Sequence, residues 1–154
     1  MLIIIKLDVM KLKKEFSNAV LIFIGVAVYF IILELLGLSK IYYLRLLNAL
    51  FVIFGVARTI KSNISEGRRN YLQNYISGFL TAAFAVVLSV IALRLYVLAR
   101  GGEAYVKTFS QVLWFGNNAS LNDYCIGLLF EGMASSMLVV FVVMNYLNSK
   151  FITD

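Results

Sequence analysis

The stretch from Tyr75 to Leu98 reads YISGFLTAAFAVVLSVIALRLYVL, and Arg94 alone interrupts it with a charge. A bilayer core is about 30 Å thick, so a helix needs about 20 consecutive apolar residues to cross it. This stretch is long enough and apolar enough to do so. It also carries small residues, which let helices approach closely in lipid: Ser77, Gly78, Ala82, Ala83 and Ala85.

Three further stretches of similar length share this character, at about 18–38, 41–60 and 124–147. The whole chain of 154 residues is 62% hydrophobic and only 14% charged, with a mean hydropathy of +0.89. Such values lie outside the range of ordinary soluble domains. The sequence therefore predicts an all-α membrane protein, a single transmembrane domain over 1–154 that folds as an antiparallel four-helix bundle.

Short signals at the ends of the apolar stretches predict where helices stop and start. Gly37 follows the first stretch as a C-terminal cap, and Ser39 is placed to cap the second, so a tight turn joins the two. Ser120 and Asp123 form an S-x-x-D pattern suited to capping the last helix. Two segments mix apolar and polar residues and are expected to lie as short interfacial helices, at about 1–16 and 103–115. The sequence leaves open whether Met1 or Met10 begins the chain.

The distribution of basic residues predicts the orientation, because Lys and Arg beside short loops favour the cytoplasmic side. Most of them lie in the N-terminal segment, in the loop between the second and third spans, and in the tail. Both termini are therefore expected to be cytoplasmic. Several of these residues are candidates for contact with lipid headgroups or a partner: Lys11, Lys13, Lys14, Arg68 and Arg69.

Four ionisable residues interrupt the spans and are the candidate site: Glu34, Arg45, Arg94 and Glu131. Threading the helices in and out of the bilayer predicts that all four lie in one outer-leaflet layer, about 6 to 10 Å deep at roughly 1.5 Å per residue. Two carboxylates and two guanidinium groups can neutralise one another there. One interpretation is a buried salt-bridge cluster that fixes helix order, or arginines that extend to the headgroups. The other is a transport site or a proton relay through a glutamate.

Another set of residues in the second span recurs at spacings of three and four and should face protein: Arg45, Asn48, Gly55 and Thr59. The chain has no His and a single Cys, Cys125, which is read as a packing residue. These counts argue against a metal or redox enzyme, so no cofactor is expected. The net charge of +6 has no basic stripe on a soluble face, so it favours anionic lipid over nucleic acid.

The residues Glu34 to Gly37, YISGFLT at 75–81 and LFEGMASS at 129–136 resemble a family of small four-span membrane proteins of Bacteroidetes bacteria whose function is unknown. The likeness extends from about Phe16 to Asn148. It implies a bacterial inner (cytoplasmic) membrane and adds no activity. The N-terminal ten residues depart from the family pattern.

These observations lead to an expected function. The first choice is a non-catalytic integral membrane subunit or scaffold that packs against other membrane proteins or copies of itself, since the soluble portions are too short to form a domain. The alternative is a small oligomeric transporter or channel that uses the Glu/Arg layer. An enzyme is not expected, because no catalytic constellation appears.

Overall fold

The structure, a computed structural model, describes residues 2–39, 41–107 and 120–147, and it leaves out the side chains of 2–11 and 42. Four long helices carry the fold, α1 (Leu2–Leu35), α3 (Asn48–Ser65), α4 (Tyr71–Ala99) and α6 (Leu121–Tyr146). Two short helices, α2 (Tyr42–Arg45) and α5 (Glu103–Val106), lie between them. The predicted all-α fold is confirmed: four segments are long and apolar enough to cross a membrane.

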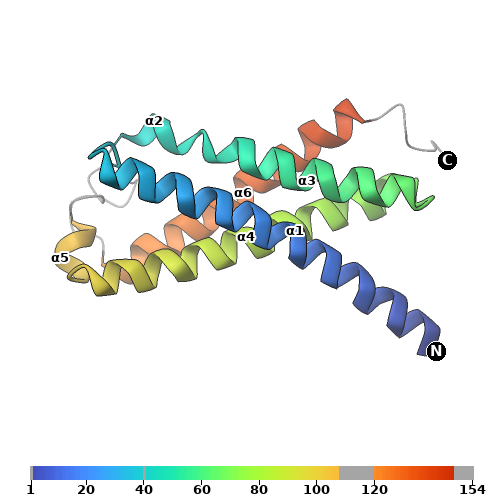
Figure 1. Ribbon diagram of the computed structural model, residues 1–154, viewed down its shortest axis with the longest axis horizontal. Coiled ribbons are helices and arrows are strands. Elements are labelled where there is room, and N and C mark those ends of the chain that lie inside the picture. Colours follow the sequence, from blue (N-terminus) through green and yellow to red (C-terminus); the bar gives the residue numbers. More distant parts are fainter. Residues whose placement is uncertain (1, 40, 108–119, 148–154) are drawn as a thin grey trace.

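The long helices run alternately up and down, so that the start of α1, the end of α6 and the turn between α3 and α4 lie at one end of the bundle (Figure 1). We call this the inner end and the opposite end, with α2 and α5, the outer end. Both α3 and α4 pack against α1 and against α6, whereas α1 and α6 hardly touch each other. The chain therefore has the architecture of a multi-pass membrane protein.

The helix ends follow the predicted signals in two of three cases. Gly37 has φ of +70°, and Leu38 N–H bonds the Leu33 carbonyl at 2.8 Å, which is the Schellman ending expected for a glycine cap. Ser120 and Asp123 form the complete capping box of α6. The predicted cap at Ser39 is wrong, because α2 begins after Ile41, which makes no side-chain cap bond.

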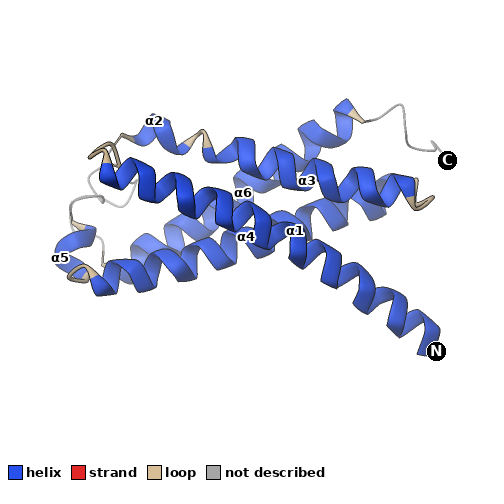
Figure 2. Ribbon diagram, in the orientation of Figure 1, coloured by secondary structure: helices blue, strands red, loops and turns tan. Residues whose placement is uncertain are grey.

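Two predicted boundaries also differ from the structure. The expected break between an interfacial segment at 1–16 and a span from 18 is absent, since α1 is one helix whose first turns extend away from the bundle (Figure 1). The second span is not one regular helix, because a turn at Leu46–Leu47 separates α2 from α3 (Figure 2). Hydrogen bonds between residues three apart tighten the chain there, as in a 3₁₀ turn. Most of the predicted outer interfacial segment lies outside the described residues, which show only α5 within it.

Glycines set how closely the helices pack. A Cβ at Gly55 would lie 2.2 Å from Ile22 Cγ1, and one at Gly132 would lie 2.7 Å from Val86 Cγ1. Only a residue without a side chain permits these α1–α3 and α4–α6 contacts. The buried small residues of α4 confirm the predicted close packing along that helix. Cys125 is buried in the cluster with Val97 and Leu121, which confirms its role in packing.

Candidate functional site

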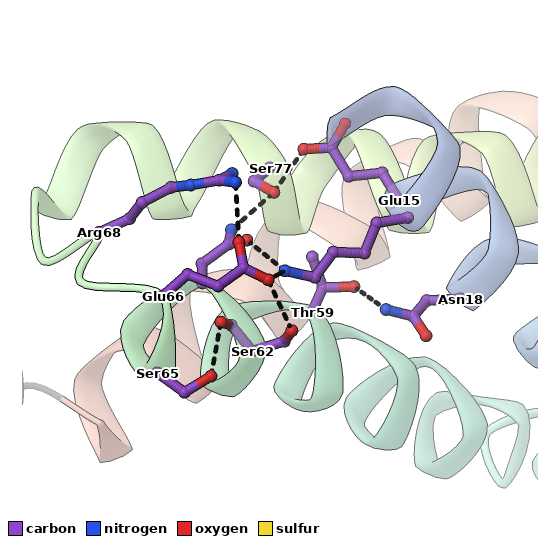
Figure 3. A network of polar contacts seen from close by, with 10 residues as sticks. Glu15, Asn18, Thr59, Ser62, Ser65, Glu66, Arg68 and Ser77 are labelled. Atoms are coloured by element: carbon purple, nitrogen blue, oxygen red, sulfur yellow. Dashed lines mark hydrogen bonds and ion pairs between the residues drawn. The ribbon is translucent and has the colours of Figure 1, made fainter. Parts of the chain in front are cut away.

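A group of buried polar side chains joins α1, α3 and α4 near the inner end of the bundle (Figure 3). We call it the inner polar cluster, and none of its side chains is more than 6% exposed. Polar groups inside a membrane protein are costly unless hydrogen-bonded, so such a cluster marks a site of structural or functional importance. Its members are Glu15, Asn18, Thr59, Asn63, Ser77 and Thr81.

One chain of hydrogen bonds ends on the carboxylate of Glu15. Ser77 Oγ donates to Glu15 Oε1, and Asn63 Nδ2 donates to Ser77 Oγ at 2.9 Å. Glu15 lies on α1, Ser77 on α4 and Asn63 on α3. A short bond to a carboxylate is the stronger, charge-assisted kind, so this chain fixes the rotation of three helices relative to one another.

A second chain lies one turn deeper in the bundle. Asn18 Nδ2 donates to Thr59 Oγ1 at 2.8 Å, and Thr59 Oγ1 lies 3.1 Å from Thr81 Oγ1. Each threonine hydroxyl also contacts a backbone carbonyl of its own helix, that of Gly55 or of Ser77. Each of these three side chains thus has a hydrogen-bond partner although it is removed from solvent.

The inner polar cluster reaches the surface through Lys14 and Glu66. Lys14 Nζ donates to Asn63 Oδ1 at 3.1 Å and to Glu66 Oε1 at 2.6 Å, and Arg68 Nη2 donates to Glu66 Oε2 at 2.7 Å. The hydrogen bond from Lys14 is the largest of the effects that hold the pKa of Glu66 below its usual range. The α3–α4 turn is thereby tied to α1 as well as to its own helices.

One buried atom beside this cluster lacks a partner among the described residues. Asn74 Nδ2 donates to the carbonyls of Arg68 and Asn70, but Asn74 Oδ1 accepts no hydrogen bond from the described part of the chain. Asn74 is 1% exposed. The arrangement as a whole is a nearly saturated hydrogen-bond network, which suits a helix latch better than an open ligand site.

The inner polar cluster was not predicted from the sequence. A signal was nevertheless present, because polar residues recur at spacings of three and four on three helices. The up-and-down topology brings these residues to the same end of the bundle. Glu15 was assigned to an interfacial segment, and the span was started at Asn18, so their shared face on α1 was not considered. The predicted stripe on the second span was partly right: Gly55 and Thr59 are buried, while Arg45 and Asn48 are half-buried.

The five predicted headgroup contacts differ in their surroundings. Lys14 and Arg68 form ion pairs with Glu66, so their charges stabilise the α3–α4 turn. Lys13 and Arg69 are exposed at the inner end. The side chain of Lys11 lies outside the described part of the chain.

The four ionisable residues predicted to share one layer do not form one cluster. Glu34 accepts a hydrogen bond from Tyr105 of α5 and lies 4.0 Å from Arg100 Nη2. Burial and, after it, this bond to Glu34 raise the pKa of Tyr105 far above its usual value, so Tyr105 stays a neutral donor. Arg45 Nη2 instead donates to Tyr124 Oη at 3.0 Å. Each of these two ions is thus satisfied in part by a tyrosine that the prediction had not included.

The other two predicted ions, Arg94 and Glu131, are exposed on the outside of the bundle. Glu131 also lies deeper than expected, because α6 begins at Leu121 rather than at Tyr124. At roughly 1.5 Å per residue it is about 15 Å from the outer end of its helix, and Arg94 is about 7 Å from the end of α4 at Ala99. Arg94 and Glu131 therefore lie at different levels.

An apolar groove of about 500 Å³ lies between α1 and α3. It offers no polar side chain to orient a ligand, since its lining consists of Leu21, Ile22, Ile24, Gly25, Leu50, Phe51 and Phe54. In the described ranges, no three His, Cys, Asp or Glu side chains come together as a metal site would require. The groove therefore has no side chain that could bind a metal or transfer a proton.

No protein family, curated protein or solved structure matches the chain. The likeness to four-span Bacteroidetes proteins stays a prediction.

Proposed function

We propose that this chain is a non-catalytic integral membrane subunit or scaffold that acts by packing against membrane proteins. The observation that carries the proposal is the exposure of Arg94 and Glu131 on spans that are otherwise apolar. A charge near the centre of a bilayer costs about 2.5 to 3.5 kcal/mol on insertion scales, and less toward an interface. A protein surface that offers polar partners to Arg94 lowers that cost. We place the chain in a bacterial cytoplasmic membrane with both termini inside, supported by the basic inner end and the family resemblance.

Purification from the native membrane in lipid nanodiscs, followed by mass spectrometry of the intact complex, tests the proposal. We expect a protein partner at fixed stoichiometry, either another membrane protein or a further copy of the chain. Recovery of single chains with lipid alone would refute it. Glu131→Gln keeps the shape of the side chain and serves as a matched variant for asking whether the charge is needed for assembly.

The second candidate, a small oligomeric transporter or channel, is supported by a different observation. The predicted Glu/Arg layer is dispersed, but the inner polar cluster places the nine-tenths buried carboxylate of Glu15 in a chain of hydrogen bonds that continues to Glu66. Proteoliposome flux assays with Glu15→Gln distinguish the two functions. A transporter loses cation or proton flux in this variant while its assembly persists; a scaffold shows no flux in either form.

A further inference from the structure

The apolar groove between α1 and α3 opens on the outside of the bundle. Four of the side chains that line it are exposed: Leu21 and Ile24 on α1, and Leu50 and Phe54 on α3. Its volume of about 500 Å³ lies within the range of ordinary ligand pockets, about 300 to 1,000 Å³. All of these residues belong to segments apolar enough to cross a membrane, so the groove opens toward lipid.

Lipid acyl chains are the groups that can fill this groove. A water molecule needs two to four polar partners, and every side chain that lines the groove is apolar. An empty groove would leave its walls without dispersion contacts on one side. Acyl chains are as apolar as leucine, so they fill the groove but are not selected by its walls. Selectivity for one lipid over another must come from polar groups at an end of the groove.

Two cations continue the groove along α3 toward the inner end. Arg58 follows Phe54 by four residues and Lys61 follows it by seven, so the three residues share one helix face. At roughly 1.5 Å per residue they lie about 6 and 10 Å beyond Phe54. Both cations are exposed, and neither makes a hydrogen bond or ion pair with any residue that the structure describes.

Residues of α1 continue the opposite wall of the groove in the same direction. Ser17 precedes Ile24 by seven residues and Lys13 precedes it by eleven, so these residues also share one helix face. Ser17 and Lys13 are exposed. Lys13 forms no ion pair within the described ranges of the chain. We call the three exposed cations, Lys13, Arg58 and Lys61, the basic mouth.

Contacts between α1 and α3 place the basic mouth at one end of the groove. Two hydrogen bonds join these helices there, from Asn18 to Thr59 and from Lys14 to Asn63. Each cation of the basic mouth lies within two residues of one of these bonded positions. The cations therefore lie at the same end of the groove and come from both of its walls.

The charge of the basic mouth is complementary to a phosphodiester. The acids nearby are engaged elsewhere, since Glu66 is paired with two other cations and Glu15 is buried and accepts a hydrogen bond from Ser77. The planar guanidinium of Arg58 can donate two parallel hydrogen bonds to a phosphate. Because Arg58 lies within a span, a phosphate beside it also lowers the cost of holding its charge in lipid.

We propose that the groove between α1 and α3 binds one anionic phospholipid, with an acyl chain against Leu21 and Phe54 and the phosphate between Arg58 and Lys61. The apolar groove and the basic mouth lie in line along the two helices, in the order of the tail and headgroup of a lipid. A soluble phosphate would use only the basic mouth. The site does not depend on the protein partner proposed above.

Native mass spectrometry of the purified full chain in detergent measures the binding of three probes. These are phosphatidylglycerol, phosphatidylcholine with the same acyl chains, and glycerol 3-phosphate, which has no tail. We expect phosphatidylglycerol to bind at least about tenfold more tightly than phosphatidylcholine, since each Lys or Arg near an anionic group contributes about fivefold in affinity. Glycerol 3-phosphate should bind most weakly. Equal affinities for the two lipids, or equal affinities for phosphatidylglycerol and glycerol 3-phosphate, would overturn the proposal.

Removal of the two α3 cations tests the headgroup site. Arg58→Gln combined with Lys61→Gln should weaken phosphatidylglycerol binding about tenfold to thirtyfold and leave phosphatidylcholine binding unchanged. Arg69→Gln combined with Lys107→Gln is the matched control, because it removes the same charge from two exposed residues elsewhere on the chain. The control should stay within about threefold of wild type, since its cations lie outside the site. An equal loss in both double variants would show general attraction of anionic lipid to a basic protein and would overturn the proposal.

Leu21→Trp tests the tail site without a change of charge. The larger side chain fills part of the groove, so it should weaken binding of both lipids at least about fivefold, as for the loss of one or two buried CH₂ contacts. Leu138→Trp, on the exposed side of α6, is the control and should bind both lipids normally. Phe54→Ala removes one wall of the groove and should weaken both lipids in the same way, which keeps the test valid if the tryptophan disturbs the fold. Unchanged affinity in both groove variants would overturn the placement of the tail.

Discussion

Replacement of Gly55 by alanine tests how closely α1 and α3 pack. The new Cβ would lie 2.2 Å from Cγ1 and 2.5 Å from Cδ1 of Ile22, far inside van der Waals contact. Ile22 is 2% exposed, so it can move away only into the α1–α3 groove that it lines or by displacing its neighbours. Either the isoleucine leaves its rotamer or the two helices separate.

Two opposing terms set the magnitude. Overpacking a well-packed interior costs about 1 to 3 kcal/mol, and the short distances favour the upper part of that range. Alanine in place of glycine returns up to about 1 kcal/mol through helix propensity. We therefore expect Gly55→Ala to lower the free energy of unfolding by about 1 to 2 kcal/mol.

Reversible unfolding in mixed detergent micelles measures this value, and the double variant with Ile22→Ala identifies its cause. Ile22→Ala alone leaves a cavity and should cost about 2 to 5 kcal/mol. The alanine at position 55 fills part of that cavity, so the double variant should lose at least about 1 kcal/mol less than the sum of the single losses. Gly78→Ala is the matched control and should cost less, because the atom nearest to its new Cβ would be Ile60 Cδ1 at 3.2 Å. Additive losses, or an unchanged stability in Gly55→Ala, would refute the close approach of the two helices.

Three further predictions concern the polar groups and the topology. Thr59→Val leaves the buried Asn18 Nδ2 without its acceptor and should cost about 1 to 3 kcal/mol of unfolding free energy, part of which returns when Asn18→Leu is added; an unchanged melting temperature would contradict the bond. The pKa of Glu66 is lowered by folding, so its carboxylate contributes to the free energy of unfolding above its unfolded pKa near 4.5. This contribution is lost as the pH falls through the folded pKa, so the difference in melting temperature between wild type and Glu66→Gln should vanish in acid. Because this carboxylate is 43% exposed, the effect at neutral pH should be at most about 1 kcal/mol, and a difference that grows in acid would show the opposite sign. Single cysteines at Arg69 and Glu103, in a Cys125→Ser background, should react with an impermeant maleimide only at Glu103→Cys in intact cells; labelling at Arg69→Cys from outside would reverse the proposed orientation.

The sequence predicted the features that depend on local chemistry. Gly37 and the Ser120–Asp123 pair end and begin helices through bonds within a few residues of themselves, so their patterns suffice. Apolar length predicted all four spans for the same reason. The turn at Leu46–Leu47 has no Pro or Gly to announce it, so composition could not predict the division of the second span into α2 and α3.

The predicted site failed where it depended on partners from other helices. Depth along separate spans predicted that Glu34, Arg45, Arg94 and Glu131 lie together. Depth does not determine how each helix is rotated about its axis, and this rotation decides which side chains face one another. The tyrosines that bind two of them lie in the short helix α5 (Tyr105) and in the first turn of α6 (Tyr124), at helix ends whose positions apolar periodicity does not define. The rotation of each helix follows from the small and polar residues buried between helices. The prediction treated these residues separately for each span.

The separation of polar residues into a buried and an exposed set has one physical origin. Lipid tails are as apolar as leucine, so burying leucine between helices gains little, and close packing with hydrogen bonds must hold the bundle together. Thr59 and Asn63 supply such bonds at the inner end, where α1, α3 and α4 meet. No comparable network of described side chains joins α4 to α6, whose contact relies on Gly132 and on apolar residues. If the same rule governs contacts between chains, small and polar residues on an exposed helix face are where a further helix gains most by binding.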